Sequence, residues 1–192
     1  MDPDPTTDAA SLEHAEHAAY AEYAAYVEQS WPTLVRAAMF LGARPHEAED
    51  VAQTTLVRCF TGWAKVSAAD DRDAYVYRML LNCLHDLRRT RWYRDRQHDD
   101  PQVLERATRA AGARGTDEAE RIAIADAVHR ALGSLSKPNR DVVVLRYFVQ
   151  LSERQTAAVL GVAPGTVKSR LSRALARLAG DDHLLDLSGG TK

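Results

Sequence analysis

The sequence predicts an all-α fold in which two small helical domains are joined by a flexible linker and the second domain ends in a helix-turn-helix. Apolar residues recur at helical spacing through nearly every structured stretch, whereas β-branched runs with period two are missing. Residues 97–117 lose that periodicity and gain proline, glycine and charge, which is typical of a linker. Near the C-terminus, a glycine and then a proline separate two short amphipathic stretches. A length of 192 residues suffices for one domain or two small ones.

The composition is that of an ordinary soluble protein, with 45% hydrophobic and 27% charged residues. No run approaches the roughly 18 apolar residues that span a bilayer, and the N-terminus lacks a basic start followed by an apolar core. We therefore expect a cytoplasmic protein without membrane insertion. Cys59 and Cys83 stand among apolar neighbours, so we expect both to be buried core residues. His14 and His17 have no further metal ligands near them, and we expect no metal and no cofactor.

Basic charge is concentrated in two blocks, although the net charge of the whole chain is −2. Residues 72–98 hold seven arginines against three aspartates, a net of +4, and residues 134–180 hold eight Lys or Arg against two acids, a net of +6. Residues 1–28 hold seven acids and no Lys or Arg, and we expect residues 1–18 to form an acidic tail. Two separated basic blocks are expected if two surfaces of the protein face phosphate groups.

The first domain is predicted over residues 19–96 as three helices. An Ala- and Tyr-rich helix ends at a turn marked by Gly42 and Pro45. A second helix has the sequence HEAEDVAQTTLVRCFTGW and leads into the polar loop VSAADDRD. The third helix, AYVYRMLLNCLHDLRRTRWYRDRQ, changes from apolar to strongly basic at Arg88.

The second domain is predicted over residues 118–180, with residues 181–192 as a tail. The VVV at 142–144 is the one candidate for a strand core, but Val142, Leu145 and Val149 repeat at helical spacing and predict a helix. The stretch LSERQTAAVLGVAPGTVKSRLSRALARL then predicts a helix, a glycine turn and a second helix that begins at a proline.

The last helix carries an apolar stripe on one side and a basic, hydroxyl-rich surface on the other. Such a helix behind a tight turn matches the recognition helix that enters the DNA major groove. Thr and Ser can bond phosphates or bases, and Lys and Arg can reach guanine edges or the backbone. The other interpretation is a helical hairpin with a solvated basic face. The candidate DNA-binding residues are Thr166, Lys168, Ser169, Arg170, Arg173 and Arg177.

The stretch LGVAPGTVKSRLSRALARL resembles the C-terminal domain of bacterial sigma-70 family factors, which reads the -35 promoter element. The likeness is strongest to the extracytoplasmic-function group. AEDVAQTTLVRCFTGW resembles the family's helix that binds core RNA polymerase, and DAYVYRMLLNCLHDLRRTRWYR resembles the helix that reads and melts the -10 element. The resemblance runs from about residue 20 to residue 180 and implies a polymerase subunit that selects promoters.

The resemblance implies a role for each surface. It assigns the -35 element to the candidate DNA-binding residues of the last helix. It implies that a coiled coil of the largest polymerase subunits binds to Asp50, Gln53 and Arg58. It assigns the -10 strand to Lys65, Asn82, Asp86, Arg88, Arg89 and Arg91, and a pocket for one flipped base to the loop between Lys65 and Asp73. An anti-sigma factor is a further partner that the resemblance admits, and the polymerase would perform the catalysis.

Two other functions remain open at the level of sequence. One is a self-sufficient helix-turn-helix transcription regulator with an N-terminal sensing or dimerisation domain. The other is an enzyme with an appended DNA-binding domain, which the missing catalytic motifs disfavour. The basic stretch DLRRTRWYR favours the sigma-factor interpretation, because a sensing domain has no need of it.

Overall fold

A computed structural model describes the backbone of residues 5–95 and 116–180, and the side chains of residues 17–90 and 124–180. Throughout these residues the chain is helical or in turns, and no strand occurs, so the all-α prediction is confirmed. The helices are α1 (Pro5–Phe40), α2 (Pro45–Thr61), α3 (Trp63–Ser67), α4 (Arg72–Asp95), α5 (Thr116–Gly133), α6 (Lys137–Val143), the π-helix η1 (Val144–Phe148), α7 (Glu153–Leu160) and α8 (Pro164–Leu178).

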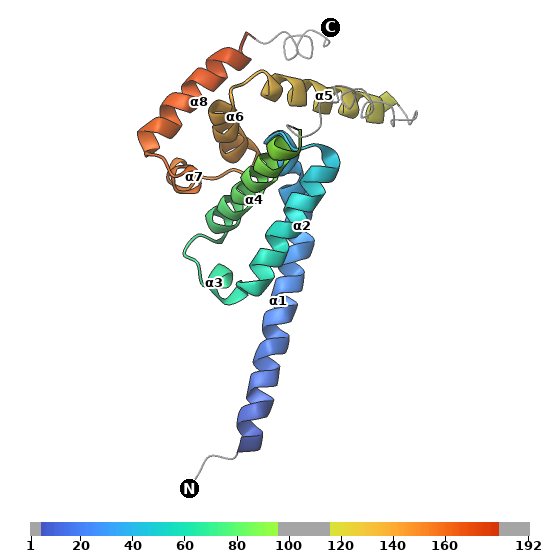
Figure 1. The fold of residues 1–192 in the computed structure, drawn as a ribbon, viewed down its shortest axis with the longest axis vertical. Helices are drawn as coiled ribbons and strands as arrows, with labels where there is room; N and C mark the ends of the chain where they lie inside the picture. The colour runs from blue at the N-terminus through green and yellow to red at the C-terminus, as the bar shows by residue number, and fades with distance from the viewer. Residues whose placement is uncertain (1–4, 96–115, 181–192) are drawn as a thin grey trace.

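Helix α1 is the long element of the molecule, and its N-terminal half extends away from the other helices (Figure 1). It begins at Pro5, so most of the segment that was expected as an acidic tail, residues 1–18, is helical. The C-terminal half of α1 packs against α2 and α4, and Leu34, Ala38 and Leu41 are buried there. None of the helices in the described part of the chain is long and apolar enough to cross a membrane.

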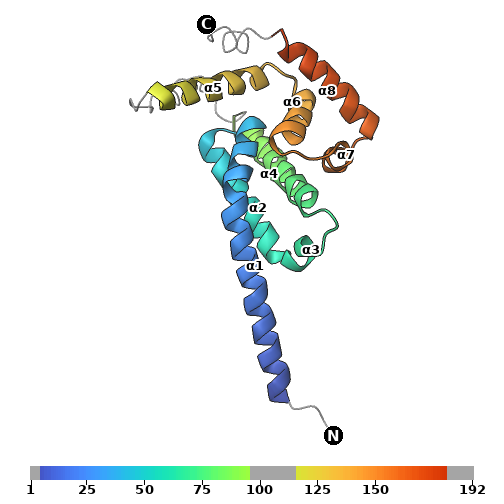
Figure 2. The ribbon, with the colours of Figure 1, turned by 180° about the vertical axis from the view of Figure 1, so that it is seen from behind.

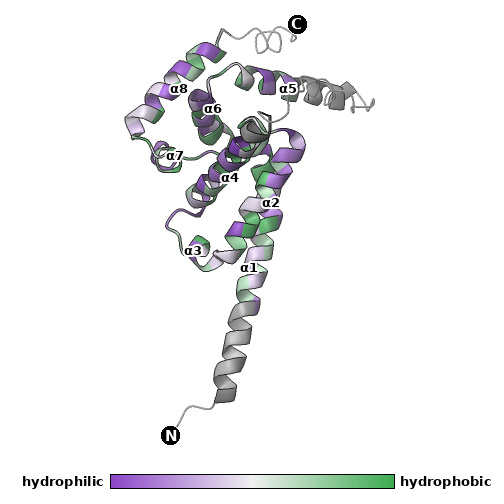
Figure 3. Cartoon of the chain, viewed as in Figure 1, coloured by the Kyte–Doolittle hydropathy of each residue, from purple (hydrophilic) through white to green (hydrophobic). Residues whose placement is uncertain are grey.

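The first unit is a bundle of α1, α2 and α4, with short α3 closing one end (Figure 1). Its apolar residues are buried between the helices. Figure 3 shows hydrophobic and hydrophilic residues following each other along α2. Cys59 and Cys83 are free and buried, as expected, and burial raises the pKa of the Cys59 thiol to about 11. Cys59 packs in the core of the first unit, where a thiol with a raised pKa stays protonated.

The second unit consists of α5, α6, η1, α7 and α8. A capping box starts α7, since the Gln155 backbone N–H donates to Ser152 Oγ at 3.2 Å and the Ser152 N–H donates to Gln155 Oε1 at 2.5 Å. The helix ends at Gly161, whose φ of 64° lies in the left-handed region that glycine tolerates. Pro164 occupies the first turn of α8, so the predicted helix, turn and helix are all present.

The two units pack against each other, with α4 beside α7 and α1 beside η1, and Figure 2 shows α4 next to the second unit from behind. One continuous core contains Leu41 and Leu84 of the first unit and Leu145 and Leu151 of the second. The rings of Phe40 and Phe148 lie 4.3 Å apart between their centroids. The protein therefore has an apolar interface between its units in addition to the chain connection.

Two features favour glycine at position 42, which lies at this interface. Its φ of 98° is a backbone conformation that residues with a side chain rarely adopt. A Cβ at this position would also lie 3.0 to 3.2 Å from the guanidinium of Arg140, which comes from α6. The glycine thus forms the turn between α1 and α2 and lets an arginine of the second unit lie against it.

Candidate nucleic-acid interface

Helix α8 presents a cationic surface opposite the side that packs. Val167 and Ala174 are buried, and Leu171 and Leu178 are half-buried. These residues hold α8 against α6 and α7, which fixes the direction in which its other faces point. The candidate DNA-binding residues lie on those faces, with Thr166 and Arg170 half-buried and Lys168, Ser169, Arg173 and Arg177 exposed.

In the described part of the chain, the side-chain hydrogen bonds of α8 stay within that helix. Ser169 Oγ donates to the Thr166 carbonyl at 3.1 Å, and Arg173 Nε donates to the Ser169 carbonyl at 3.2 Å. Among the described residues, the salt bridges involve none of the cations of α8. Their charges are therefore available to an anionic partner.

The residues predicted to bind core polymerase lie on the outer face of α2. Asp50, Gln53 and Arg58 are exposed, whereas Val51 and Cys59 face the core. The backbone N–H of Arg44 donates to Glu47 Oε2 at 2.9 Å, and this contact fixes the start of the helix. The three predicted residues therefore belong to one rigid element.

The structure brings one core-binding candidate together with one -10 candidate. Arg58 Nη2 lies 3.6 Å from Asp86 Oδ2 on α4, and Asp86 Oδ1 accepts from Arg89 Nη2 at 3.2 Å. The sequence analysis assigned Arg58 and Asp86 to different surfaces. In the structure the two surfaces adjoin at this ion pair. Asn82 is exposed one turn before Asp86 on the same helix.

Arg88 differs from the other cations predicted for the -10 surface. It is half-buried, and its Nη2 donates to the carbonyl of Leu41 at 2.5 Å. Burial is the main reason that the pKa of Arg88 is lowered, and nearby Arg140 lowers it further. Its guanidinium supports the fold in this arrangement rather than projecting outward. The side chain of Arg91 lies outside the described residues.

Lys65 is exposed on α3, next to the loop that was predicted to hold a flipped base. Nearby Trp63 belongs to an aromatic cluster. Its ring lies 5.3 Å from Tyr23 and 5.4 Å from Tyr26, and the Arg72 guanidinium lies 5.3 Å above it. Trp63 therefore belongs to the core.

The aromatic residues of α4 fall into three groups. Tyr77 is buried, and burial raises its pKa. Tyr75 is 43% exposed and stays available for a contact. The side chains of Trp92 and Tyr93 lie outside the described residues.

A polar contact between the units was missed by sequence reasoning. Lys137 Nζ lies 2.8 Å from His85 Nε2 of α4 and 2.8 Å from Asp141 Oδ2 of its own helix. Asp141 is buried. The sequence indicates this, because Asp141 directly precedes the apolar residues of the run DVVVL. Burial lowers the pKa of His85, and the neighbouring Lys137 adds to the shift.

Comparisons with known proteins agree for both units. Residues 26–94 match the family described as Sigma-70 region 2, and residues 125–178 match the family described as Sigma-70, region 4. The RNA polymerase sigma-E factor of Streptomyces avermitilis is 36% identical over 154 residues, which cover 80% of this chain and 81% of that protein. The ECF RNA polymerase sigma factor SigM of Mycobacterium tuberculosis is 31% identical over 147 residues, with coverage of 76% and 69%.

A solved structure has the same arrangement of helices. The sigma factor RpoE of Bartonella quintana, in complex with the anti-sigma factor NepR, superposes with a TM-score of 0.62 at 27% identity, over 82% of this chain and 94% of that chain. The matches to both regions do not favour a self-sufficient regulator with a sensing domain, because the N-terminal unit is itself a sigma region. The chain belongs to the sigma-70 family, in its extracytoplasmic-function group, and is an RNA polymerase sigma factor that directs transcription initiation.

Proposed function

We propose that this sigma factor divides promoter recognition among three surfaces. Helix α8 reads the -35 element, the edge formed by Lys65, Asn82, Asp86 and Arg89 contacts the -10 element, and the outer face of α2 binds core polymerase. The observation that carries the proposal is the cationic face of α8, whose charges have no salt-bridge partner in the described part of the chain. We infer that the protein acts in the cytoplasm, together with core polymerase and promoter DNA.

The position of each residue along α8 suggests what it contacts. Residues near the N-terminus of a recognition helix reach base edges, while residues farther along contact the backbone. Lys168 and Arg170 lie in the first two turns and suit guanine N7 and O6. Arg173 and Arg177 are exposed nearer the C-terminus and suit phosphates.

The contact between Arg58 and Asp86 suggests that core binding and -10 reading depend on each other. Their 3.6 Å ion pair connects the outer face of α2 to the edge of α4. A polymerase element that binds α2 would then lie beside the strand held by α4. Both side chains are about half exposed, so the pair itself contributes little to stability.

An anti-sigma factor is the regulatory partner that we propose. The structural relative RpoE of Bartonella quintana was solved in complex with one, NepR. The similarity to that structure covers 82% of this chain and 94% of that one. Such a partner would compete with core polymerase for the sigma factor.

Run-off transcription tests the assignment of surfaces. The full chain would be added to purified core polymerase with a pool of genomic promoter fragments, and selected transcripts would be sequenced. We expect Lys168→Ala and Arg170→Ala to change which promoters are selected, and Asp50→Ala and Gln53→Ala to reduce output from all of them. Arg36→Ala, which changes an exposed arginine on α1, is the matched control. No promoter selection with core, or equal losses in every variant, would overturn the proposal.

A further inference from the structure

Arg72 joins three helices at the end of the loop that the family resemblance assigned to a flipped base. It is the first residue of α4, and its Nη2 atom lies 3.0 Å from Glu22 Oε1 on α1. The same nitrogen lies 3.5 Å from the carbonyl oxygen of Ser67, the last residue of α3. One guanidinium therefore connects α1, α3 and α4, although its two partners are 50 and 5 positions away along the chain.

The guanidinium of Arg72 also lies over two aromatic rings. Its carbon is 5.3 Å from the ring centroid of Trp63 and 5.8 Å from that of Tyr26. A cation at such a distance is attracted by the face of the ring. Trp63 is only 8% exposed and packs against Tyr23, so its ring is a fixed support. The rings and the two oxygen atoms together restrict the guanidinium to one place.

These contacts close the loop between α3 and α4. The loop consists of residues 68–71, and Arg72 at its C-terminal end bonds the Ser67 carbonyl at its N-terminal end. Within the loop, the Ala69 N–H donates to the Val66 carbonyl at 3.3 Å. A loop whose two ends are joined by one side chain has few conformations to choose from, so it can be ordered before any ligand arrives.

The ion pair of Arg72 with Glu22 does not by itself account for this arrangement. The two side chains are 35% and 49% exposed, and ion pairs as exposed as this contribute little to stability. A planar guanidinium can lie on a ring while it donates to more than one oxygen, and a lysine ammonium cannot replace it in both respects. The side chain therefore acts mainly on the position of the loop.

We propose that Arg72 is a positioning residue that closes the loop of residues 68–71 and braces it against Glu22 on α1 and the ring of Trp63. The loop is then formed before the -10 strand reaches it. It loses little entropy when it captures an unstacked base, which favours strand opening. This effect rests on the proposed function, because it assumes that this edge of the first unit contacts the -10 strand. The closure of the loop does not rest on that assumption.

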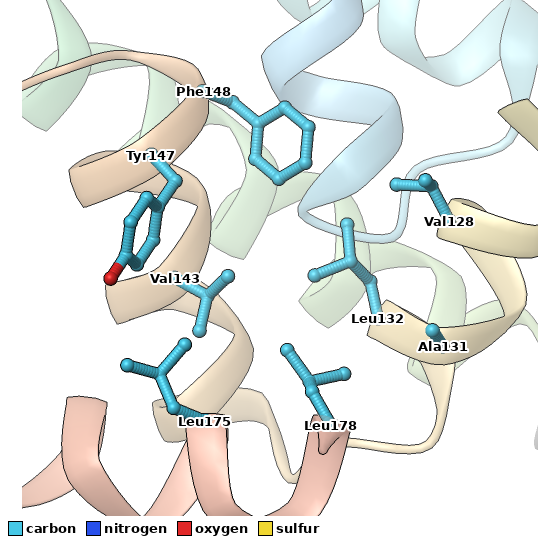
Figure 4. A pocket seen from close by; sticks show the side chains of 8 residues that line it. All are labelled: Val128, Ala131, Leu132, Val143, Tyr147, Phe148, Leu175 and Leu178. Carbon is cyan, nitrogen blue, oxygen red and sulfur yellow. The ribbon is translucent and has the colours of Figure 1, made fainter. Parts of the chain in front are cut away.

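Amide hydrogen exchange of the full chain, followed by NMR, tests the closure without DNA. We expect Arg72→Ala to speed exchange several-fold at the amides of Ala69 and Ala74, the second of which donates to Asp71 Oδ1 at 3.0 Å. Arg72→Lys should have a smaller effect, because lysine can keep the ion pair but not the planar stacking. Exchange should stay unchanged in α5 and α8, whose side chains line a separate apolar groove in the second unit (Figure 4).

Two exposed residues of α1 supply matched controls. Glu22→Gln should also speed exchange in the loop, whereas Glu28→Gln, which changes another exposed acid of α1, should not. Arg36→Ala is the control for Arg72→Ala. Slow exchange at buried Leu80 shows that the core is intact, and Glu22→Gln and Arg72→Lys decide the outcome if Arg72→Ala loosens the core as well. Loop exchange that stays unchanged in the brace variants would overturn the inference and leave the proposed function untouched.

Strand opening with core polymerase is the second readout. A 2-aminopurine in the -10 element reports unstacking through its fluorescence. We expect Arg72→Ala to lower the rate of opening several-fold while binding to closed duplex promoter is unchanged. A promoter with a mismatched bubble at the -10 element should restore transcription by this variant, because its strand is already open.

Two results of this second experiment would contradict different parts of the account. If the bubble promoter fails to restore transcription, Arg72 does more than position the loop for strand opening, and the inference is overturned. If loop exchange rises but strand opening is unchanged, the proposed contact of this edge with the -10 strand fails while the closure of the loop by Arg72 stands.

Discussion

Two neighbouring arginines, Arg88 and Arg89, have different structural roles although the sequence predicted the same one. Successive residues on a helix point about 100° apart, so adjacent side chains meet different surroundings. Arg88 turns inward to the Leu41 carbonyl, whereas Arg89 stays exposed beside Asp86. Arg88 therefore stabilises the fold through its bond to the Leu41 carbonyl. Arg89 remains a candidate for contact with the -10 strand.

We expect Arg88→Ala to lower the free energy of unfolding by about 1–3 kcal/mol, because a charge-assisted bond is lost and a carbonyl near the core is left unpaired. Arg89→Ala should change it by no more than about 0.5 kcal/mol, because its ion pair is exposed. Urea denaturation of both variants measures the difference. Equal destabilisation by the two changes would contradict these roles.

Arg170→Ala should weaken transcription from promoters that carry the preferred base by about 1–3 kcal/mol, through loss of a base contact. Arg177→Ala should weaken all promoters alike and reduce the salt slope of binding by about one, if it holds a phosphate. Binding of the complex with core polymerase to promoter variants at several salt concentrations separates the two effects. Equal loss on every promoter sequence after Arg170→Ala would refute its role in reading bases.

His85 makes stability depend on pH. Burial and the charge of Lys137 lower its pKa from the ordinary 6.5, with Arg88 acting in the same direction and Asp141 and Asp86 opposing. The unfolded chain therefore binds a proton more readily than the folded chain between the lowered pKa and 6.5. The contribution of His85 to the free energy of unfolding is therefore fully present above pH 6.5, and it is lost as the pH falls from 6.5 to the lowered pKa.

Unfolding by urea at about pH 7.5 and about pH 5.5 measures this dependence. The wild-type chain should lose more stability on acidification than His85→Asn, which cannot take up the proton. A pH dependence that is the same in both chains would show that His85 is not its source.

At the scale of the elements, the helices that carry local signals were predicted well. The glycine turn, the proline start of α8 and its apolar stripe depend on neighbouring residues, and all are present. The π-helix Val144–Phe148 was expected only as ordinary helix, because apolar spacing does not distinguish the two. The early start of α1 at Pro5 was missed because its first turns lack a buried stripe in the sequence.

Two glycines close to each other test the turn between α7 and α8. Gly161→Ala should cost about 1–2 kcal/mol of stability, because the left-handed backbone penalises a Cβ although space is open around it. Gly165→Ala is the matched control within α8 and should stabilise by up to about 1 kcal/mol. Thermal unfolding compares them, and a stabilising Gly161→Ala would contradict the assigned backbone.

At the scale of the whole molecule, the sequence predicted two basic helical units but not how they pack. The contact of Phe40 with Phe148 and that of His85 with Lys137 join residues that are 108 and 52 positions apart. No local pattern encodes such a pairing. The domain boundaries and the reach of the linker over residues 97–117 stay predictions.

The packed arrangement is too compact for the proposed promoter contacts. The -35 and -10 promoter elements are centred about 25 base pairs apart. This separation is about 85 Å along B-DNA. Because α4 lies against α7, the two reading surfaces cannot span that distance until the units separate. We expect core polymerase to bind each unit and to hold them apart, which makes the second DNA contact intramolecular.

Promoter binding with and without core polymerase therefore tests the account most directly. An equilibrium gel-shift assay would compare the full chain alone with the chain plus core on one selected promoter and on a scrambled duplex. We predict weak binding without sequence preference for the chain alone, and strong preference for the promoter once core is present. Tight, sequence-specific binding by the chain alone, or no promoter preference with core, would contradict the account.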